Sequence, residues 1–309
     1  MNDSEPTLPP QRTTNGFIVV AVLWILGALA TLATIYSVYV IDTAVAFSVH
    51  DERLQAEAMV TAGLELTAYQ LASPLQTRPV QHAVTFRAGH ANVAVAYRSE
   101  DARIDLNVAP KELLAGLFTT FGAGPADAAN YADRIIGWRS PPPEDQDLEA
   151  SAYRTAGLRY APRGGRFAHV GELSLVMGIP EFLVERALPF VTVYSGQAEV
   201  NVLEAAPEVL AALPGVNPEM LHSVLVQRAA TPQNGQVVAA LLGPAQSLVT
   251  SEATKSVRVT VSVVFDNGRR LGSEVVILLS DERSEPYRVL SWRDQLDDGP
   301  DDRPRTGVR

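Results

Sequence analysis

The sequence has 309 residues, of which 47% are apolar and 19% are charged, and it contains no cysteine. This composition excludes an intrinsically disordered chain and predicts a folded protein. Without cysteine, the chain has no disulfide framework, no Cys-ligated metal site and no thiol nucleophile. The formal net charge of −10 argues against nucleic acid as a partner, because affinity for nucleic acid comes mainly from Lys and Arg that neutralise phosphates.

The first predicted element is an uncharged segment of 25 residues, Phe17–Ile41. A helix of that length spans about 37 Å, enough to cross a hydrocarbon core of about 30 Å with some tilt. Residues 1–16 before it are polar and are typical of a leader. The alternative is a secretory signal cut after Ala28-Leu29-Ala30, which would remove the chain up to Ala30 and leave eleven uncharged residues at the new N-terminus.

The helical pattern continues beyond the uncharged segment. Apolar residues recur with helical spacing and form one stripe, which consists of Phe47, Leu54, Ala58, Ala62, Leu66 and Tyr69. Pro74 and Pro79 end the pattern. We therefore predict one helix over Phe17–Ala72, with a membrane-spanning part at 17–41 and an amphipathic stalk within 42–75. A membrane anchor followed by a separate first helix would give the same periodicity.

Alternating apolar and polar residues predict two β regions, 76–103 and 251–292. The predicted strands are Val80–Arg87 and Ala91–Arg98 in the first region, and Ser256–Phe265, Arg270–Ser280 and Pro286–Trp292 in the second. An Asn-Gly turn at Asn267-Gly268 joins two of them into a hairpin. The strands therefore predict one antiparallel sheet formed by two distant parts of the chain.

The segment between the two β regions, 104–250, is rich in helix and turn signals. We therefore predict an α+β fold, in which a pilin-like long N-terminal helix packs on an antiparallel sheet and a large helical insert interrupts the sheet. The tail at 293–309 has five Asp, four Arg and no apolar run, a composition that predicts disorder.

The insert contains an internal repeat, because Ile104–Leu117 aligns with Val200–Leu213 at a constant offset. Each copy is predicted to form a short strand, a polar cap and an amphipathic helix with proline in its first turn. The second copy continues into Pro214-Gly215-Val216-Asn217 and another helix, and Gly178-Ile179-Pro180 follows a similar pattern. The insert is thus expected to use a helix–turn–helix unit more than once.

This unit resembles the helix-hairpin-helix, which binds nucleic-acid backbones through exposed N–H groups and nearby basic side chains. Here Asn217 and Pro180 occupy the position of the second glycine, and Pro218 has no N–H group. Between Ile104 and Ala245 there are nine Lys or Arg against fifteen Asp or Glu. These observations favour a scaffold role for the hairpins and predict no nucleic-acid partner, with a membrane-anchored DNA-binding protein as the alternative.

In chain order these features resemble the minor pseudopilin K family of the bacterial type II secretion system, also called general secretion pathway protein K. The resemblance covers nearly the whole chain. It rests on Gly16-Phe17 before the apolar run, Arg53–Leu71, Ile104–Pro110, Ala156–Tyr160, Arg166-Phe167, Glu172-Leu173, Tyr194–Gly196, Val200–Val202 and Leu213–Gly215.

The resemblance implies that prepilin peptidase cuts between Gly16 and Phe17 and that Phe17 becomes an N-methylated terminus. It also implies an inner-membrane anchor with a periplasmic globular part that joins other minor pseudopilins in a pseudopilus. The residues that we assign to this assembly are Ala21, Phe47, Leu54, Ala58, Ala62 and Leu66.

Ala21 would be the fifth residue after cleavage, where most pilin-like proteins have a glutamate that pairs with the N-terminal amine of a neighbouring subunit. A buried carboxylate without such a pair is costly. A subunit that lacks this carboxylate can therefore sit first in the filament. The resemblance implies that the protein caps the tip of the pseudopilus and helps to initiate its assembly. Ala21 as one more lipid-facing residue is the alternative.

The resemblance further implies a calcium site in the acidic segment after Trp138, with Glu144, Asp145, Asp147 and Glu149 as ligands, because Ca²⁺ prefers several carboxylate oxygens. Ser140 and Pro141 replace acidic residues expected there, so a solvated acidic loop is the alternative. No other cofactor is expected. The sequence contains no hydrolase, zinc-protease, Walker or dinucleotide-binding motif, and we expect no enzymatic activity.

Overall fold

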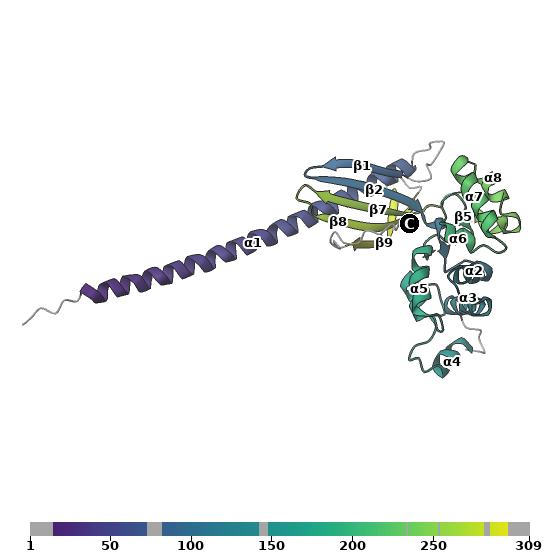
Figure 1. The fold of residues 1–309 in the computed structure, drawn as a ribbon, viewed down its shortest axis with the longest axis horizontal. Coiled ribbons are helices and arrows are strands. Elements are labelled where there is room, and N and C mark those ends of the chain that lie inside the picture. The colour runs from purple at the N-terminus through teal and green to yellow at the C-terminus, as the bar shows by residue number, and fades with distance from the viewer. Residues whose placement is uncertain are drawn as a thin grey trace, which may run out of the picture. The chain divides into compact units, whose positions relative to one another are not determined.

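The computed structural model describes residues 15–72, 82–141, 148–232, 234–252, 254–280 and 285–295. The chain divides into two compact units, Met1–Ala58 and Met59–Arg309. The described residues of the first unit belong to one helix, and the second unit holds the end of that helix, a sheet and the helical insert. Figure 1 shows the elements of each unit.

The long helix predicted from the sequence is present as α1, which extends over Asn15–Ala72. It has no proline in its 58 residues, so nothing removes a hydrogen bond from its interior. Thr31 and Thr34 lie in the uncharged segment, and their hydroxyl groups donate to the carbonyls of Gly27 and Ala30 at 2.8 and 2.9 Å. These polar side chains are therefore satisfied within the helix itself.

The sheet has five antiparallel strands in the order β1-β2-β7-β8-β9. The strands are β1 (His82–Ala88), β2 (Ala91–Ser99), β7 (Ser256–Phe265), β8 (Arg270–Leu279) and β9 (Tyr287–Gln295). All five predicted strands are present, with ends within two residues of the prediction for the first four. The fifth strand, β9, extends into the segment expected to be disordered, because Arg293 and Asp294 pair with Glu274 and Ser273 of β8. Residues 296–309 of the predicted tail lie outside the described residues.

Within the second unit, the end of α1 packs on one face of the sheet. Val60, Leu64 and Ala68 of α1 are at most 3% exposed. A Cβ atom placed on Gly63 would lie 2.9 Å from a methyl group of Val95 in β2. The absence of a side chain at Gly63 thus allows the helix to approach the sheet closely, and the predicted helix-on-sheet packing is confirmed.

The insert leaves the sheet after β2 and returns at β7, which are neighbouring strands. Both connections lie at the same end of these strands, since Ser99 pairs with Val257. The helices of the insert are α2 (Lys111–Thr120), α3 (Pro125–Arg139), α4 (Leu148–Thr155), α5 (Glu181–Ala187), α6 (Pro207–Ala211), α7 (Pro218–Ala230) and α8 (Gly235–Ala240). Its 3₁₀ helices are η1 (Glu100–Ala102), η2 (Val170–Leu175), η3 (Leu188–Phe190) and η4 (Gly243–Leu248), and its short strands are β3 (Ile104–Asp105), β4 (Val191–Thr192), β5 (Val200–Asn201) and β6 (Val249–Thr250).

The insert has a hydrophobic core of its own, which extends from Ile104 to Ala245. Helices α2 and α6 supply fully buried residues to it, including Leu113, Leu117 and Leu210. Such a core lets the insert fold as a body attached to the end of the sheet.

Candidate functional site

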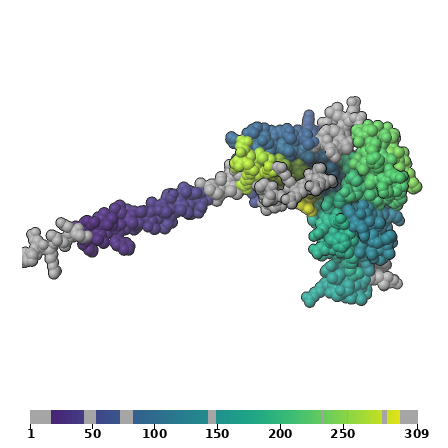
Figure 2. Space-filling model, in the orientation of Figure 1, coloured from purple at the N-terminus to yellow at the C-terminus, as the bar shows by residue number. Residues whose placement is uncertain are grey.

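The first part of α1, Phe17–Thr43, has the length and composition of a membrane-spanning helix. No residue of its apolar window is buried within the chain, and the side chains of Leu23 and Trp24 are 62% and 78% exposed. Figure 2 shows this segment in purple with its side chains uncovered. So much exposed apolar surface is stable only in lipid or against other proteins. A secretory signal has the same features, so both processing alternatives fit this segment.

The residues predicted for processing and assembly lie at the start of α1. The helix begins at Asn15, one residue before Gly16, and Phe17 is 79% exposed. Ala21 follows Phe17 by one helical turn and lies on the same side of α1. The roles of these residues in cleavage and assembly stay predictions.

The predicted apolar stripe of the stalk lies on the exposed side of α1. Leu54 is 51% exposed, Ala58 and Ala62 are exposed, and Leu66 is half-buried. The side chain of Phe47 lies outside the described residues. The sheet packs on a different stripe of the helix, so the predicted stripe remains available to another protein.

The two copies of the sequence repeat adopt similar local structures in the insert. The strand of the first copy, β3, pairs in parallel with β4, and the strand of the second, β5, pairs in parallel with β6. After each strand a side-chain oxygen caps the turn. Asp105 Oδ1 accepts from the backbone N–H of Asn107 at 2.7 Å, and Asn201 Oδ1 accepts from that of Leu203 at 3.0 Å.

An arginine from a later helix closes each of these turns. Arg139 of α3 donates to the carbonyl oxygens of Leu106 and Ala109 at 2.6 and 2.8 Å. Arg228 of α7 donates to the carbonyl of Ala205 at 2.6 Å, and to that of Val202 at 3.4 Å. Each guanidinium thus holds a strand–turn–helix segment against the helix that carries the arginine.

The hairpins that resemble a nucleic-acid-binding motif use their backbone groups internally. Gly178 and Gly215 adopt positive φ angles of 86° and 76° in the turns. Asn217 then caps helix α7, and its side-chain oxygen accepts from the backbone N–H of Met220 at 2.8 Å. One N–H group that a phosphate would use is therefore already bonded, which favours the scaffold role.

The predicted calcium ligands fall mostly outside the described residues. Glu144, Asp145 and Asp147 lie in the segment 142–147, which the structure does not describe. Glu149 is described, and its Oε2 accepts from Arg134 Nη1 at 2.9 Å. No group of three or more His, Asp or Glu residues able to hold a metal ion occurs among the described residues. The calcium site stays a prediction that depends on the acidic segment.

A cluster of charged residues lies where the insert joins the sheet. Arg258 of β7 donates to both carboxylate oxygens of Glu100, from Nε at 2.5 Å and from Nη2 at 3.1 Å, and it also pairs with Glu274 of β8. Glu100 accepts a further hydrogen bond from the hydroxyl of Thr192 in β4. Glu100 is 1% exposed, so its charge is stabilised by these partners.

A second carboxylate at this junction belongs to the insert. Glu204 Oε2 accepts from the backbone N–H of Ser99, at the end of β2, at 2.8 Å. Burial, together with the nearby carboxylate of Asp101, raises the pKa of Glu204 to about 7, although the backbone hydrogen bond from Ser99 opposes this effect. Burial also raises the pKa of Asp101, although a backbone hydrogen bond from Thr254 opposes that effect. The junction therefore holds carboxyl groups that take up protons more readily than exposed ones.

Glu100, Glu204 and Arg258 were not among the functional residues predicted from the sequence. The only local signals are the acidic pair Glu100-Asp101 directly after a strand and the arginine between two buried valines of β7. Neither signal identifies a partner, because Glu100 and Arg258 are far apart in the sequence.

Two comparisons with known proteins agree with this architecture. Residues 91–196 match the family model described as type II secretion system protein K. Among solved structures, the chain is similar to a chain of the GspK-GspI-GspJ complex from the enterotoxigenic Escherichia coli type 2 secretion system. The identity is 15% and the TM-score is 0.58, over 78% of this chain and 95% of that chain. This likeness shows a shared fold. No curated protein matches the sequence at a significant level.

Proposed function

Because residues 91–196 match the family model of type II secretion system protein K, we propose that the chain is a minor pseudopilin that caps the tip of the periplasmic pseudopilus. In this role it helps to initiate pseudopilus assembly for protein export. The proposed partners are other minor pseudopilins, as in the complex that contains the similar chain.

This proposal rests on one observation, that the two ends of helix α1 have different surroundings. Its first part is apolar and exposed, and its last turns pack on the sheet through Val60, Leu64 and Ala68. One continuous helix can therefore move from the inner membrane into a filament core while its sheet and insert stay in the periplasm. The exposed stripe with Ala58 and Ala62 offers a second face for neighbouring helices.

Processing by prepilin peptidase is tested by mass spectrometry of the mature N-terminus. We expect an N-methylated Phe17. A terminus at Thr31 would instead identify a secretory signal, and an intact Met1 would contradict both.

Contact with partners is tested by crosslinking, which the absence of cysteine makes specific. We expect Ala62→Cys, on the exposed stripe of α1, to crosslink to other minor pseudopilins when they are co-expressed. Ala94→Cys is the matched control, because Ala94 is exposed on β2, away from α1. Equal crosslinking of both variants would contradict assembly through the stalk stripe.

A further inference from the structure

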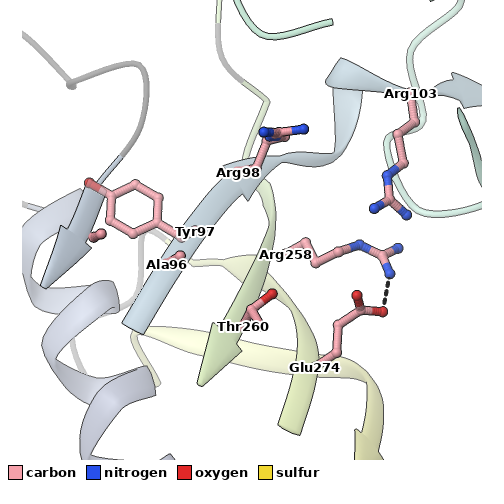
Figure 3. Close-up of a pocket in the computed structure, with 8 residues that line it drawn as sticks. Ala96, Tyr97, Arg98, Arg103, Arg258, Thr260 and Glu274 are labelled. Carbon is pink, nitrogen blue, oxygen red and sulfur yellow. Dashed lines mark hydrogen bonds and ion pairs between the residues drawn. The ribbon is translucent and has the colours of Figure 1, made fainter. Parts of the chain in front are cut away.

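An open pocket of about 300 Å³ lies on the sheet near its junction with the insert. Arg98, Arg258, Thr260 and Glu274 line it from strands β2, β7 and β8, and Arg103 closes it from the segment that enters the insert. On β2 and β7 these positions alternate with the buried valines that face α1. Figure 3 shows the pocket and the three arginines around it.

The three arginines differ in their partners. Arg258 already has partners, because it forms ion pairs with Glu100 and Glu274. Its side chain is 11% exposed. Arg98 and Arg103 donate no side-chain hydrogen bond to any residue in the described parts of the chain. Each guanidinium has five N–H donors, so this side of the pocket carries many donors that have no acceptor among the side chains of the described residues.

The repulsion between these arginines makes the pocket unfavourable in free energy when no anion is bound. Figure 3 shows the guanidinium groups of Arg103 and Arg258 turned towards each other. Burial and the positive charge of Arg258 lower the pKa of Arg103, and Arg98 lowers it further. Glu100 and Glu274 oppose this effect but they are already bound to Arg258. The residues that line the pocket and Glu100 together comprise three arginines and two carboxylates, a surplus of one positive charge. Glu204, which lies near Arg98, offsets this surplus only where it is ionised.

We propose that this pocket binds a singly charged carboxylate group, which accepts hydrogen bonds from the guanidinium groups of Arg98 and Arg103. The planar fork of a guanidinium matches the two oxygens of a carboxylate. One negative charge balances the surplus, whereas a doubly charged phosphate would leave an excess of negative charge beside Glu274. Both a small carboxylic acid and an acidic side chain of another protein supply this group, and the pocket volume admits either.

The test is a titration of the full-length chain in detergent micelles, followed by the arginine side-chain N–H signals in ¹⁵N NMR spectra. The probes are acetate, N-acetyl-glutamate methylamide and inorganic phosphate, each against chloride at constant ionic strength and pH. We expect the Arg98 and Arg103 signals to shift with acetate in a saturable way. We expect chloride to give no saturation and phosphate to bind more weakly than acetate.

Three variants distinguish binding in the pocket from nonspecific effects of ions on the protein. Arg98→Met should weaken acetate binding, observed on the Arg103 signal, about tenfold or more, because a charge-assisted pair is lost. Since Arg98 is exposed, this substitution leaves the core intact. In the reciprocal measurement, binding of acetate to Arg103→Met is observed on the Arg98 signal. Arg270→Met, an exposed arginine of β8 outside the pocket, should leave the affinity unchanged.

The outcomes are distinct. Binding of N-acetyl-glutamate methylamide at least as tight as that of acetate supports an acidic side chain as the ligand, and exclusion of the larger probe supports a small acid. Absence of a saturable shift, an unchanged affinity in Arg98→Met, or tighter binding of phosphate than of acetate would overturn the carboxylate site.

Discussion

Gly116 and Ala212 lie in contact where α2 and α6 meet, and they occupy the same position in the two copies of the sequence repeat. A Cβ atom on Gly116 would lie only 1.8 Å from the carbonyl oxygen of Ala212. The close approach of α2 and α6 therefore depends on the absence of a side chain at Gly116.

The first prediction concerns this contact. Gly116→Ala should lower the free energy of unfolding by about 2 kcal/mol or more, because the added methyl group separates two packed helices. The loss should occur although alanine favours helix over glycine by about 1 kcal/mol. Urea unfolding of the detergent-solubilised chain, followed by near-ultraviolet circular dichroism, measures the change.

The control for this prediction is Gly165→Ala. A Cβ atom on Gly165 meets nothing within 4 Å, and the residue has no positive φ angle. Its substitution should change stability little. Equal stability of the two variants would show that α2 and α6 do not pack as closely as described.

A second prediction concerns the arginines that close the two turns. Arg139→Met keeps the apolar stem of the side chain but removes the two hydrogen bonds to the carbonyl oxygens of Leu106 and Ala109. This substitution should lower the free energy of unfolding by about 2–3 kcal/mol. Arg139→Lys should restore little, since one ammonium group does not reproduce the bidentate geometry. Arg154→Met, an exposed arginine on α4, is the control. Full restoration by lysine would mean that charge alone matters at this position.

The sequence predicted the long helix, the five strands and their shared sheet because each of these depends on local periodicity. It did not determine which side of the stalk packs on the sheet. Two stripes with helical spacing are present in α1, one with Val60, Leu64 and Ala68 and one with Ala58 and Ala62. The structure buries the first of these stripes, and the close approach of the helix to the sheet at Gly63 lies on that side.

The cluster of charged residues where the insert joins the sheet depends on contacts that the periodicity of the sequence does not predict. Glu100 and Arg258 meet only after the whole insert has folded and returned the chain to the neighbouring strand. Likewise, Arg98 and Arg103 line one pocket because the chain turns between them at η1. Residues of this kind can be identified by charge in a sequence, but their partners are set by the path of the insert.

A third prediction tests the proposed position at the filament tip. Ala21→Glu introduces a carboxylate that no subunit ahead can pair, and an unpaired charge in apolar surroundings costs roughly 3 kcal/mol at the centre of a membrane helix. Secretion by a strain that depends on this variant should fall several-fold. Ala21→Leu, which stays apolar, should support normal secretion. Full secretion with Ala21→Glu would show that the absence of a carboxylate at position 21 does not support a place at the filament tip.

The last prediction concerns pH and follows from Glu204. The folded chain keeps the proton on Glu204 up to about pH 7, whereas an unfolded chain releases it near its ordinary value of 4.5. The free energy of unfolding should therefore fall as the pH rises across this window, by at most about 1.4 kcal/mol per pH unit from this group. Asp101, whose pKa burial also raises, acts in the same direction.

Glu204→Gln separates this carboxyl group from the others. The amide keeps an oxygen for the N–H of Ser99 but has no titratable proton, so the loss of stability between pH 5 and pH 8 should be about 2 kcal/mol smaller than in the unmodified chain. Urea unfolding at several pH values measures the difference. Glu219→Gln removes an exposed carboxylate at the start of α7 and should leave the pH dependence unchanged. If Glu204→Gln also leaves it unchanged, the carboxyl group is ionised in the folded chain at pH 5, and the junction is not the site of proton uptake.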